Sequence, residues 1–138
     1  MKISEAINYA DSNIKNNIDA SDKELWLAQL DGRTILSLYD THKNLALDTD
    51  SAWVKHVLFC LGRGETDGEY TSEDLLLIRF PFDNIYVNYL CSRIYLALFE
   101  LVRYENEEKL FNEGLKEYEN YINRAFAPKA GVEFITGR

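Results

Sequence analysis

Residues 82–104 read FDNIYVNYLCSRIYLALFELVRY and are apolar around almost the whole circumference of a helix. Asp83 lies near the start, where an acidic side chain is favourable beside the positive end of the helix dipole. A helix that is apolar on all sides belongs in the centre of a core, so the sequence predicts a long central helix here. Polar or charged residues interrupt the run, among them Asn88, Ser92, Arg93 and Glu100. A membrane span tolerates such residues poorly, so we expect a buried helix and no membrane contact.

A second long helix is predicted directly after it, over residues 105–126. Five residues at helical spacing form its apolar face: Phe111, Leu115, Tyr118, Ile122 and Phe126. Five glutamates form its other face: Glu107, Glu108, Glu113, Glu117 and Glu119. Pro128 should end this helix, because proline cannot continue one. Residues 129–138 then form an extended tail whose apolar side chains are Val132, Phe134 and Ile135.

Two helices are predicted before the central one. The first begins at Ile3, repeats apolar residues at helical spacing, and should end near Asn16. Ser21 and Glu24 have the spacing of a capping box, so the second helix should start there and run to about His42.

The segment between residues 43 and 80 has a different pattern. Residues 53–61, WVKHVLFCL, fit one helix face, but their β-branched and aromatic content also fits a strand. Residues 75–78, LLLI, are typical of a short buried strand that Pro81 stops. We slightly favour a β-hairpin of these two runs, joined by the glycine-rich, acidic turn at residues 62–68.

The predicted fold is therefore mainly α. It is a small bundle of about four helices, with a short β-hairpin or loop insertion before the long central helix and an extended C-terminal tail. One domain is expected over residues 1–128, with the insertion at about 45–80 and the tail at 129–138, because 138 residues suit a single domain.

Composition excludes several functional classes. The chain has 23 Asp and Glu against 15 Lys and Arg, a net charge of −8, which disfavours tight binding to DNA, RNA or anionic membranes. The first residues lack the apolar core of a secretory signal. Cys60 and Cys91 cannot form a disulfide framework, and two free thiols fit a reducing cytosol.

Residues that could support catalysis are few. The two histidines, His42 and His56, have no partner at a recognisable metal-ligand or catalytic spacing, so we expect structural or solvent roles. Residues 62–68, GRGETDG, lack the Lys-Ser/Thr ending of a phosphate loop, and their acids would repel phosphate. We expect no enzyme activity, no metal and no cofactor.

Several motifs together resemble a known family. They are DKELWLAQLDGR at residues 22–33, LLLI at 75–78, PFDNIY at 81–86, RYEN at 103–106 and YINR at 121–124. In this order the chain is similar to the head–tail connector (adaptor) proteins of long-tailed bacteriophages and prophages. The similarity spans residues 3–128 and contains no catalytic signature.

The resemblance implies a structural virion protein at the head–tail interface, made in the host cytoplasm. Such a protein binds the portal protein as a ring, probably of 12 copies, extends the DNA channel, and offers a surface to a tail-completion or stopper protein. DNA passes nearby without specific binding. The alternatives are another head or tail completion or assembly factor, or a small intracellular protein-binding regulator.

Three sets of residues are candidate contact sites under this hypothesis. The tail would dock on the portal or on a neighbouring subunit through Val132, Phe134, Ile135 and Arg138. Tyrosines suit both core edges and interfaces, and the candidates for subunit contact are Tyr86, Tyr89, Tyr104, Tyr118 and Tyr121. Acidic side chains are either a solvated surface or a channel wall that repels DNA, and the candidates are Glu107, Glu113, Glu117, Glu65 and Glu69.

Overall fold

Five α-helices make up most of the chain over residues 1–129, the part that this computed structural model describes. They are α1 (Ile3–Asn13), α2 (Ala20–Thr34), α3 (Ala52–Cys60), α4 (Asn84–Ala97) and α5 (Leu101–Ala125). A π-helical turn, η1 (Ile35–Tyr39), continues α2. Residues 1–129 contain no β-strand, only isolated bridges. The mainly α prediction is confirmed.

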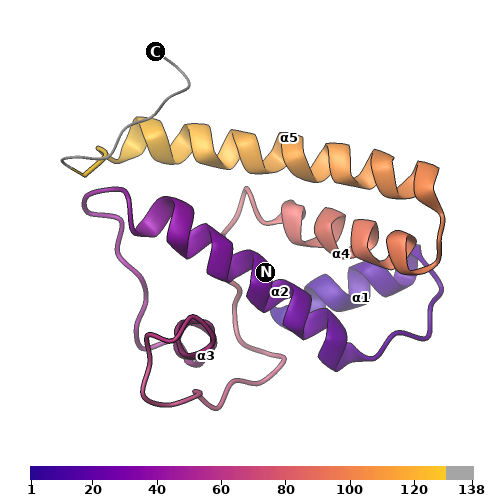
Figure 1. The fold of residues 1–138 in the computed structure, drawn as a ribbon, viewed down its shortest axis with the longest axis horizontal. Coiled ribbons are helices and arrows are strands. Elements are labelled where there is room, and N and C mark those ends of the chain that lie inside the picture. The colour runs from indigo at the N-terminus through magenta and orange to yellow at the C-terminus, as the bar shows by residue number, and fades with distance from the viewer. Residues whose placement is uncertain (130–138) are drawn as a thin grey trace.

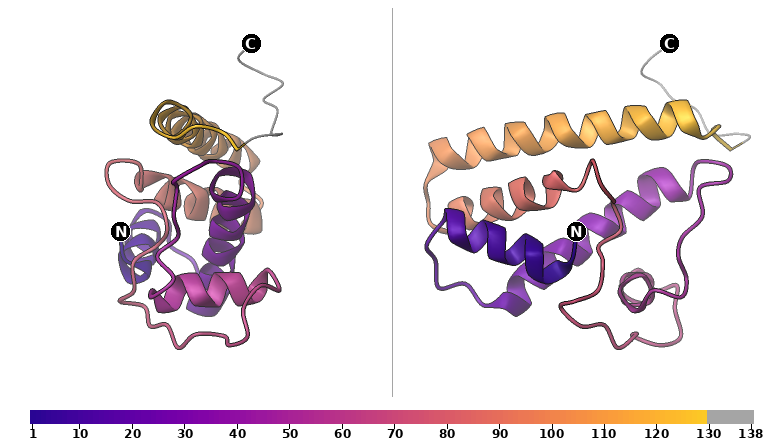
Figure 2. Two further views of the ribbon diagram at one scale, coloured as in Figure 1. Left: turned by 90° about the vertical axis from the view of Figure 1, so that its left-hand side faces the viewer. Right: turned by 180° about the vertical axis from the view of Figure 1, so that it is seen from behind.

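The helices form layers on either side of α4. In Figures 1 and 2, α5 lies along one side of the molecule, α3 lies at the opposite side, and α1, α2 and α4 lie between them. Helix α4 contacts α5, α1 and α2, whereas α3 packs on α2. The most apolar stretch of the sequence therefore does supply the central helix.

The prediction of one unbroken helix over residues 82–104 is wrong, because the chain turns back at Phe99. The Phe99 amide donates to Leu96 O at 3.1 Å and the Glu100 amide to Tyr95 O at 3.0 Å, the two bonds of a Schellman motif. Phe99 has a φ of 59°, a conformation that glycine usually supplies at this position. No glycine marks the turn in the sequence, so the pattern of apolar residues gave no sign of it.

The predicted β-hairpin is also wrong, because residues 53–61 lie in α3 rather than in a strand. The Ser51 hydroxyl accepts a hydrogen bond from the Val54 amide at 3.3 Å and so caps the start of this helix. Trp53, Val54 and Val57 are buried on one face. The helical alternative was the correct interpretation of this ambiguous run.

Residues 75–78 are an extended segment and not a strand of a sheet. The Leu76 amide donates to Met1 O at 2.9 Å and the Ile3 amide to Asp74 O at 3.0 Å, so the segment pairs briefly with the N-terminal residues. Residues 76–78 are buried between the helices. These residues are apolar because they are buried. A short buried strand has the same run of apolar residues, so the sequence pattern does not distinguish the two.

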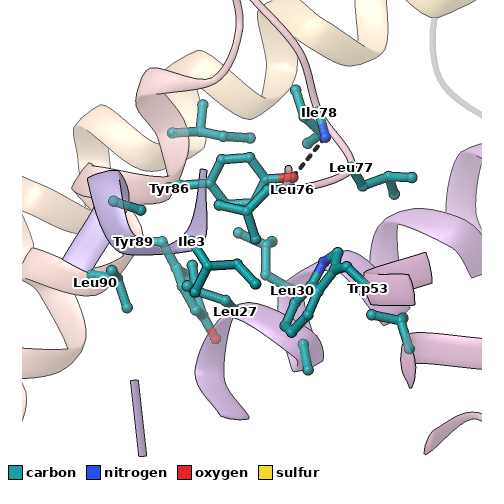
Figure 3. Close-up of a cluster of buried hydrophobic side chains, with 14 of the residues drawn as sticks. Ile3, Leu27, Leu30, Trp53, Leu76, Leu77, Ile78, Tyr86, Tyr89 and Leu90 are labelled. Carbon is teal, nitrogen blue, oxygen red and sulfur yellow. Dashed lines mark hydrogen bonds between the residues drawn. The ribbon is translucent and has the colours of Figure 1, made fainter. Parts of the chain in front are cut away.

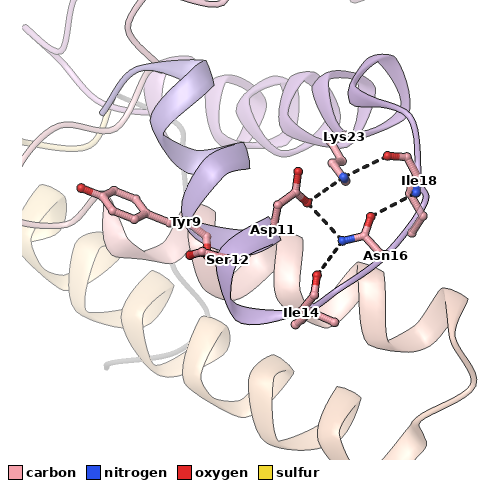
Figure 4. A network of polar contacts seen from close by, with 7 residues as sticks. All are labelled: Tyr9, Asp11, Ser12, Ile14, Asn16, Ile18 and Lys23. Atoms are coloured by element: carbon pink, nitrogen blue, oxygen red, sulfur yellow. Dashed lines mark hydrogen bonds and ion pairs between the residues drawn. The ribbon is translucent and has the colours of Figure 1, made fainter.

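Lys23, and not a Ser21 capping box, sets the junction of α1 and α2. Helix α2 begins one residue earlier, at Ala20, with Asp19 as its N-cap. The buried Lys23 ammonium donates to Asp11 Oδ1 at 2.7 Å and to Ile18 O at 2.9 Å, as Figure 4 shows. These contacts hold the loop between α1 and α2 in place. Helix α1 itself ends at Asn13 and not near Asn16.

One core joins all of these elements. Its largest fully buried side chains include Ile3 of α1, Leu27 of α2, Trp53 of α3 and Tyr86 of α4. Figure 3 shows them around Leu76 and Ile78. Helix α5 contributes fewer buried residues, Tyr118 and Ile122, and keeps most of its surface in solvent.

Candidate functional site

A buried carboxylate, Asp31, lies where the motifs of the sequence meet. It accepts hydrogen bonds from Trp53 Nε1 at 2.8 Å, from the Leu77 amide at 3.1 Å and from the Tyr86 hydroxyl at 2.6 Å. The Tyr86 oxygen in turn accepts from the Ile78 amide at 2.7 Å, the bond drawn in Figure 3. One side chain thus connects α2, α3, α4 and the segment at 75–78.

Burial determines the pKa values of Asp31 and of its partner Tyr86. Burial raises its pKa to about 6, although its three neutral donors favour the ionised form and lower the pKa. Burial and the nearby Asp31 charge raise the pKa of Tyr86 well above its usual value. Both groups are fully buried, so they fix the packing and are not accessible to a substrate.

The five candidate tyrosines occupy different environments. Tyr86, Tyr89 and Tyr118 are buried, Tyr104 is half-buried, and Tyr121 is exposed. The Tyr86 hydroxyl is used inside the core, and the Tyr89 hydroxyl accepts from Arg33 Nη2 at 2.7 Å. Tyr121 is therefore the candidate whose ring is most open to a partner.

Tyr121 belongs to an aromatic groove of about 380 Å³ near the C-terminal end of α5. Phe82 lies within 5.4 Å of the Tyr118 ring and 5.1 Å of the Tyr121 ring, measured between centroids. Phe80 also lines the groove and is 86% exposed, next to a cis Phe80–Pro81 peptide bond. The PFDNIY and YINR motifs, far apart in sequence, meet here.

A second exposed apolar surface lies at the other end of α5, at the turn from α4. We call it the turn patch: Leu98, Phe99, Leu101 and Val102. Phe99 is 86% exposed and Val102 is 73% exposed. Contiguous exposed apolar side chains of this kind mark interaction sites more often than isolated ones do. The apolar pattern of residues 82–104 predicts a buried helix through all four residues, so this surface was not predicted from the sequence.

The candidate acidic residues lie on two sides of the molecule. Glu113 and Glu117 are exposed on α5, and Glu107 is half-buried there, where burial raises its pKa. Glu65 and Glu69 are exposed in the loop after α3, on the side opposite α5 (Figures 1 and 2). The two sets cannot line the same surface of one subunit.

The two acidic sets differ in the basic residues that lie among them in the sequence. Between Arg63 and Arg79 the chain has five Asp and Glu residues and no Lys or Arg. Helix α5 carries six carboxylates, but four basic residues are interspersed with them, among them Lys109 and Lys116. The sequence of the loop therefore has the more uniform negative charge, with Glu73 paired to Lys2 Nζ at 3.1 Å.

The two histidines have defined partners. The buried His42 lies with Nε2 2.8 Å from Asn123 Oδ1 and joins the end of η1 to α5. His56 lies with Nδ1 2.6 Å from Asp67 Oδ1 and with Nε2 3.7 Å from Cys60 Sγ. The contacts of His56 with Cys60 and Asp67 were not predicted from the sequence. The helical alternative for residues 53–61 would have placed Cys60 one turn from His56, but nothing local indicated Asp67.

Other candidate sites fall outside the described chain or are not found in it. Val132, Phe134, Ile135 and Arg138 lie beyond residue 129. Among residues 1–129, no group of three or more His, Cys, Asp or Glu side chains is arranged to hold a metal ion. No helix in this part of the chain has both the length and the apolar character needed to cross a membrane.

Comparisons of the chain with protein-family models, with curated proteins and with solved structures found no match.

Proposed function

We propose that this chain is the subunit of a phage head–tail connector, an adaptor ring that binds the portal and extends the DNA channel. The proposal rests first on the sequence resemblance. The motifs that carry it meet in space: Asp31 of LDGR bonds Tyr86 of PFDNIY and the amide of Leu77 of LLLI. Residues of these motifs thus stabilise the fold and carry no catalytic role in this proposal.

The observation that best supports ring assembly is the pair of apolar surfaces at the two ends of α5. A ring built by rotation needs heterologous contacts, in which one surface of each subunit meets a different surface of the next. The turn patch projects Phe99, and the aromatic groove is lined by Phe80 and Tyr121. Leu101 and Tyr121 are separated by about 30 Å of helix. We infer that the turn patch of one subunit fills the aromatic groove of its neighbour.

Assembly on purified portal tests both parts of this proposal. The wild-type chain should be monomeric alone and form rings, probably of 12 copies, when portal is added. Phe99→Asp and Tyr121→Lys should each lower ring occupancy at least tenfold, because each places a charge in an apolar contact. Electron microscopy and the mass of the complex measure occupancy.

A matched control is Tyr9→Asp, which alters an exposed aromatic residue on α1, away from both surfaces. It should leave ring formation unchanged. A chain that dimerises without portal and does not bind it would contradict the connector function. Normal rings from both Phe99→Asp and Tyr121→Lys would contradict the assigned contact but not the function.

The tail keeps its predicted role in this scheme. Residues 130–138 follow Lys129, whose amide donates to Thr41 O at 2.9 Å beside the end of α5. Docking of Val132, Phe134 and Ile135 on the portal or a neighbour stays a prediction.

A further inference from the structure

Helix α3 carries a thiol and a base, Cys60 and His56, and the loop after it carries a carboxylate, Asp67, that contacts the base. Cys60 Sγ lies 3.7 Å from His56 Nε2, one helical turn away, and His56 Nδ1 lies 2.6 Å from Asp67 Oδ1. An ionised carboxylate only accepts hydrogen bonds, so Nδ1 carries the ring proton. The lone pair of Nε2 then faces the sulfur, and the thiol can donate its proton to it.

The imidazole is held in this orientation from two further sides. Its centroid lies 5.6 Å from that of Trp53 and 4.6 Å from that of Tyr70. Gly68, with a φ of +71°, lets the loop pack against the start of α3, since a Cβ there would lie 2.6 Å from Ala52 O. This close packing holds the neighbouring Asp67 beside His56.

Cys60 needs a base in order to act as a nucleophile, because its sulfur is protonated at neutral pH. Partial burial and the charge of Asp67 raise the pKa of Cys60, so at neutral pH it is a thiol and not a thiolate. A thiol becomes a competent nucleophile when a base in contact removes its proton during attack. His56 is in that position.

A groove of about 460 Å³ between α2, α3 and α4 lies beside Cys60. Cys60 forms part of its wall, and Leu25, Leu36 and Leu61 supply apolar surface. Arg33 and Arg93 line it as well. Arg93 Nε is buried and has no hydrogen-bond partner within the described chain. Two guanidinium groups beside an apolar wall suit a small molecule that carries a carboxylate.

We propose that Cys60, His56 and Asp67 form a thiol-exchange site that takes small carboxylate-bearing disulfides from this groove. The Cys60 sulfur attacks one sulfur of the disulfide while its proton moves to His56 Nε2. The disulfide S–S bond breaks, and a Cys60–ligand disulfide forms. The leaving thiolate takes the proton from His56 and departs as a thiol, so no further oxidant is needed. This site is separate from both connector surfaces, and neither proposal depends on the other.

The test compares the reaction rates of the folded protein with two aromatic disulfides at neutral pH. Dithiobis(nitrobenzoate) carries carboxylates, and dithiodipyridine carries none. Cys60→Ser should abolish the fast reaction with both reagents, because Cys91 is buried and its pKa is raised to about 11. His56→Gln should slow both reactions at least tenfold, and Asp67→Asn at least threefold. Arg33→Gln should slow only the carboxylate reagent.

Lys55→Gln is the matched control, since it removes an exposed charge from the same helix without touching the three residues. It should leave both rates within twofold of the wild type. Thermal unfolding of each variant shows whether it is folded. Rates for folded His56→Gln within twofold of the wild type would overturn the proposed base. Equal slowing of both reagents by Arg33→Gln would overturn carboxylate recognition.

Discussion

At the residue scale, Asp31 shows how a buried carboxylate can be retained without a cation. Desolvation of the charge is unfavourable, and the three groups bonded to Asp31 are neutral. Those three donors come from Trp53, Leu77 and Tyr86, and each would otherwise be buried without a partner. Without Asp31, these buried donors would lose their hydrogen-bond partner. The free-energy cost of leaving several buried donors unpaired is larger than the stabilisation that one hydrogen bond contributes. Asp31 therefore holds residues 75–78 in place, although this extended segment does not pair with a β-sheet.

Asp31 should make stability depend on pH in a direction opposite to that of most acids. Its pKa is about 6 in the folded chain and 3.8 when exposed, so between these values the folded state binds a proton that the unfolded state releases. The stability that Asp31 contributes is fully present below about pH 4 and declines as pH rises through 6. Over that range the loss should be about 3 kcal/mol, from the size of the pKa difference.

Asp31→Asn removes this titration and serves as the reference. Urea unfolding of both chains between pH 4 and 7.5 measures the free energy of unfolding. The stability of the wild type relative to Asp31→Asn should fall with rising pH and become constant above the folded pKa. A relative stability that rises with pH would contradict the assigned shift.

At the element scale, the sequence predicts helix content better than helix ends. The periodicity of α1, α2 and α5 was sufficient to predict that each helix exists, but not where it begins. Helix α2 begins at Ala20, after its N-cap Asp19, and Lys23 turns inward to Asp11. The turn at Phe99 was missed because it uses a non-glycine residue with positive φ. The predicted hairpin is wrong in part because the amides of Leu77 and Ile78 bond to side chains of α2 and α4, a tertiary effect that local propensity does not encode.

The contact between α4 and α5 depends on Gly114. A Cβ at this position would lie 2.6 Å from Ile85 Cγ2, and Ile85 is buried. Alanine normally stabilises a helix by about 1 kcal/mol relative to glycine. Here the added methyl must displace a stiff β-branched side chain, which costs about 1–3 kcal/mol.

Gly114→Ala should therefore lower the free energy of unfolding by about 1 kcal/mol in spite of its better helix propensity. Asn112→Ala, at an exposed position on the same helix, should raise it by a few tenths of a kcal/mol. Chemical denaturation at one pH measures both changes. A stabilised Gly114→Ala would show that Ile85 moves aside at little cost.

At the scale of the whole molecule, the candidate surfaces have a consistent arrangement. The turn patch and the aromatic groove lie at the two ends of α5, and the acidic loop lies on the opposite side from α5 (Figure 1). The sequence identified the acidic residues and Tyr121 as candidates. It did not show which tyrosines are buried, or that the two acidic sets face opposite sides, because both depend on how the helices pack.

If neighbouring subunits meet through the ends of α5, the acidic loop and the outer face of α5 are free to face other partners. We expect the loop to line the DNA channel, because its charge is not interrupted by basic residues. Glu65→Lys combined with Glu69→Lys should slow DNA ejection from particles severalfold, since added cations bind phosphate. Ejection kinetics in a fluorescent-dye assay measure the effect.

The matched control reverses two charges on α5, Glu113→Lys with Glu117→Lys, and gives the same change in net charge. Its particles should eject DNA at the wild-type rate. Slow ejection by the α5 variant together with normal ejection by the loop variant would place α5, and not the loop, at the channel.

The pairing of the N-terminal residues with the segment before α4 also governs events during translation. The Ser4 hydroxyl donates to Glu73 Oε2, 69 residues further along the chain, and the amides of Ile3 and Ser4 donate to carbonyl groups of residues 74 and 72. At typical ribosome speeds these partners are synthesised roughly 3–14 s later. Until then the apolar face of α1 can contact α2 but not α4, so we expect the nascent chain to expose part of this face before the domain folds.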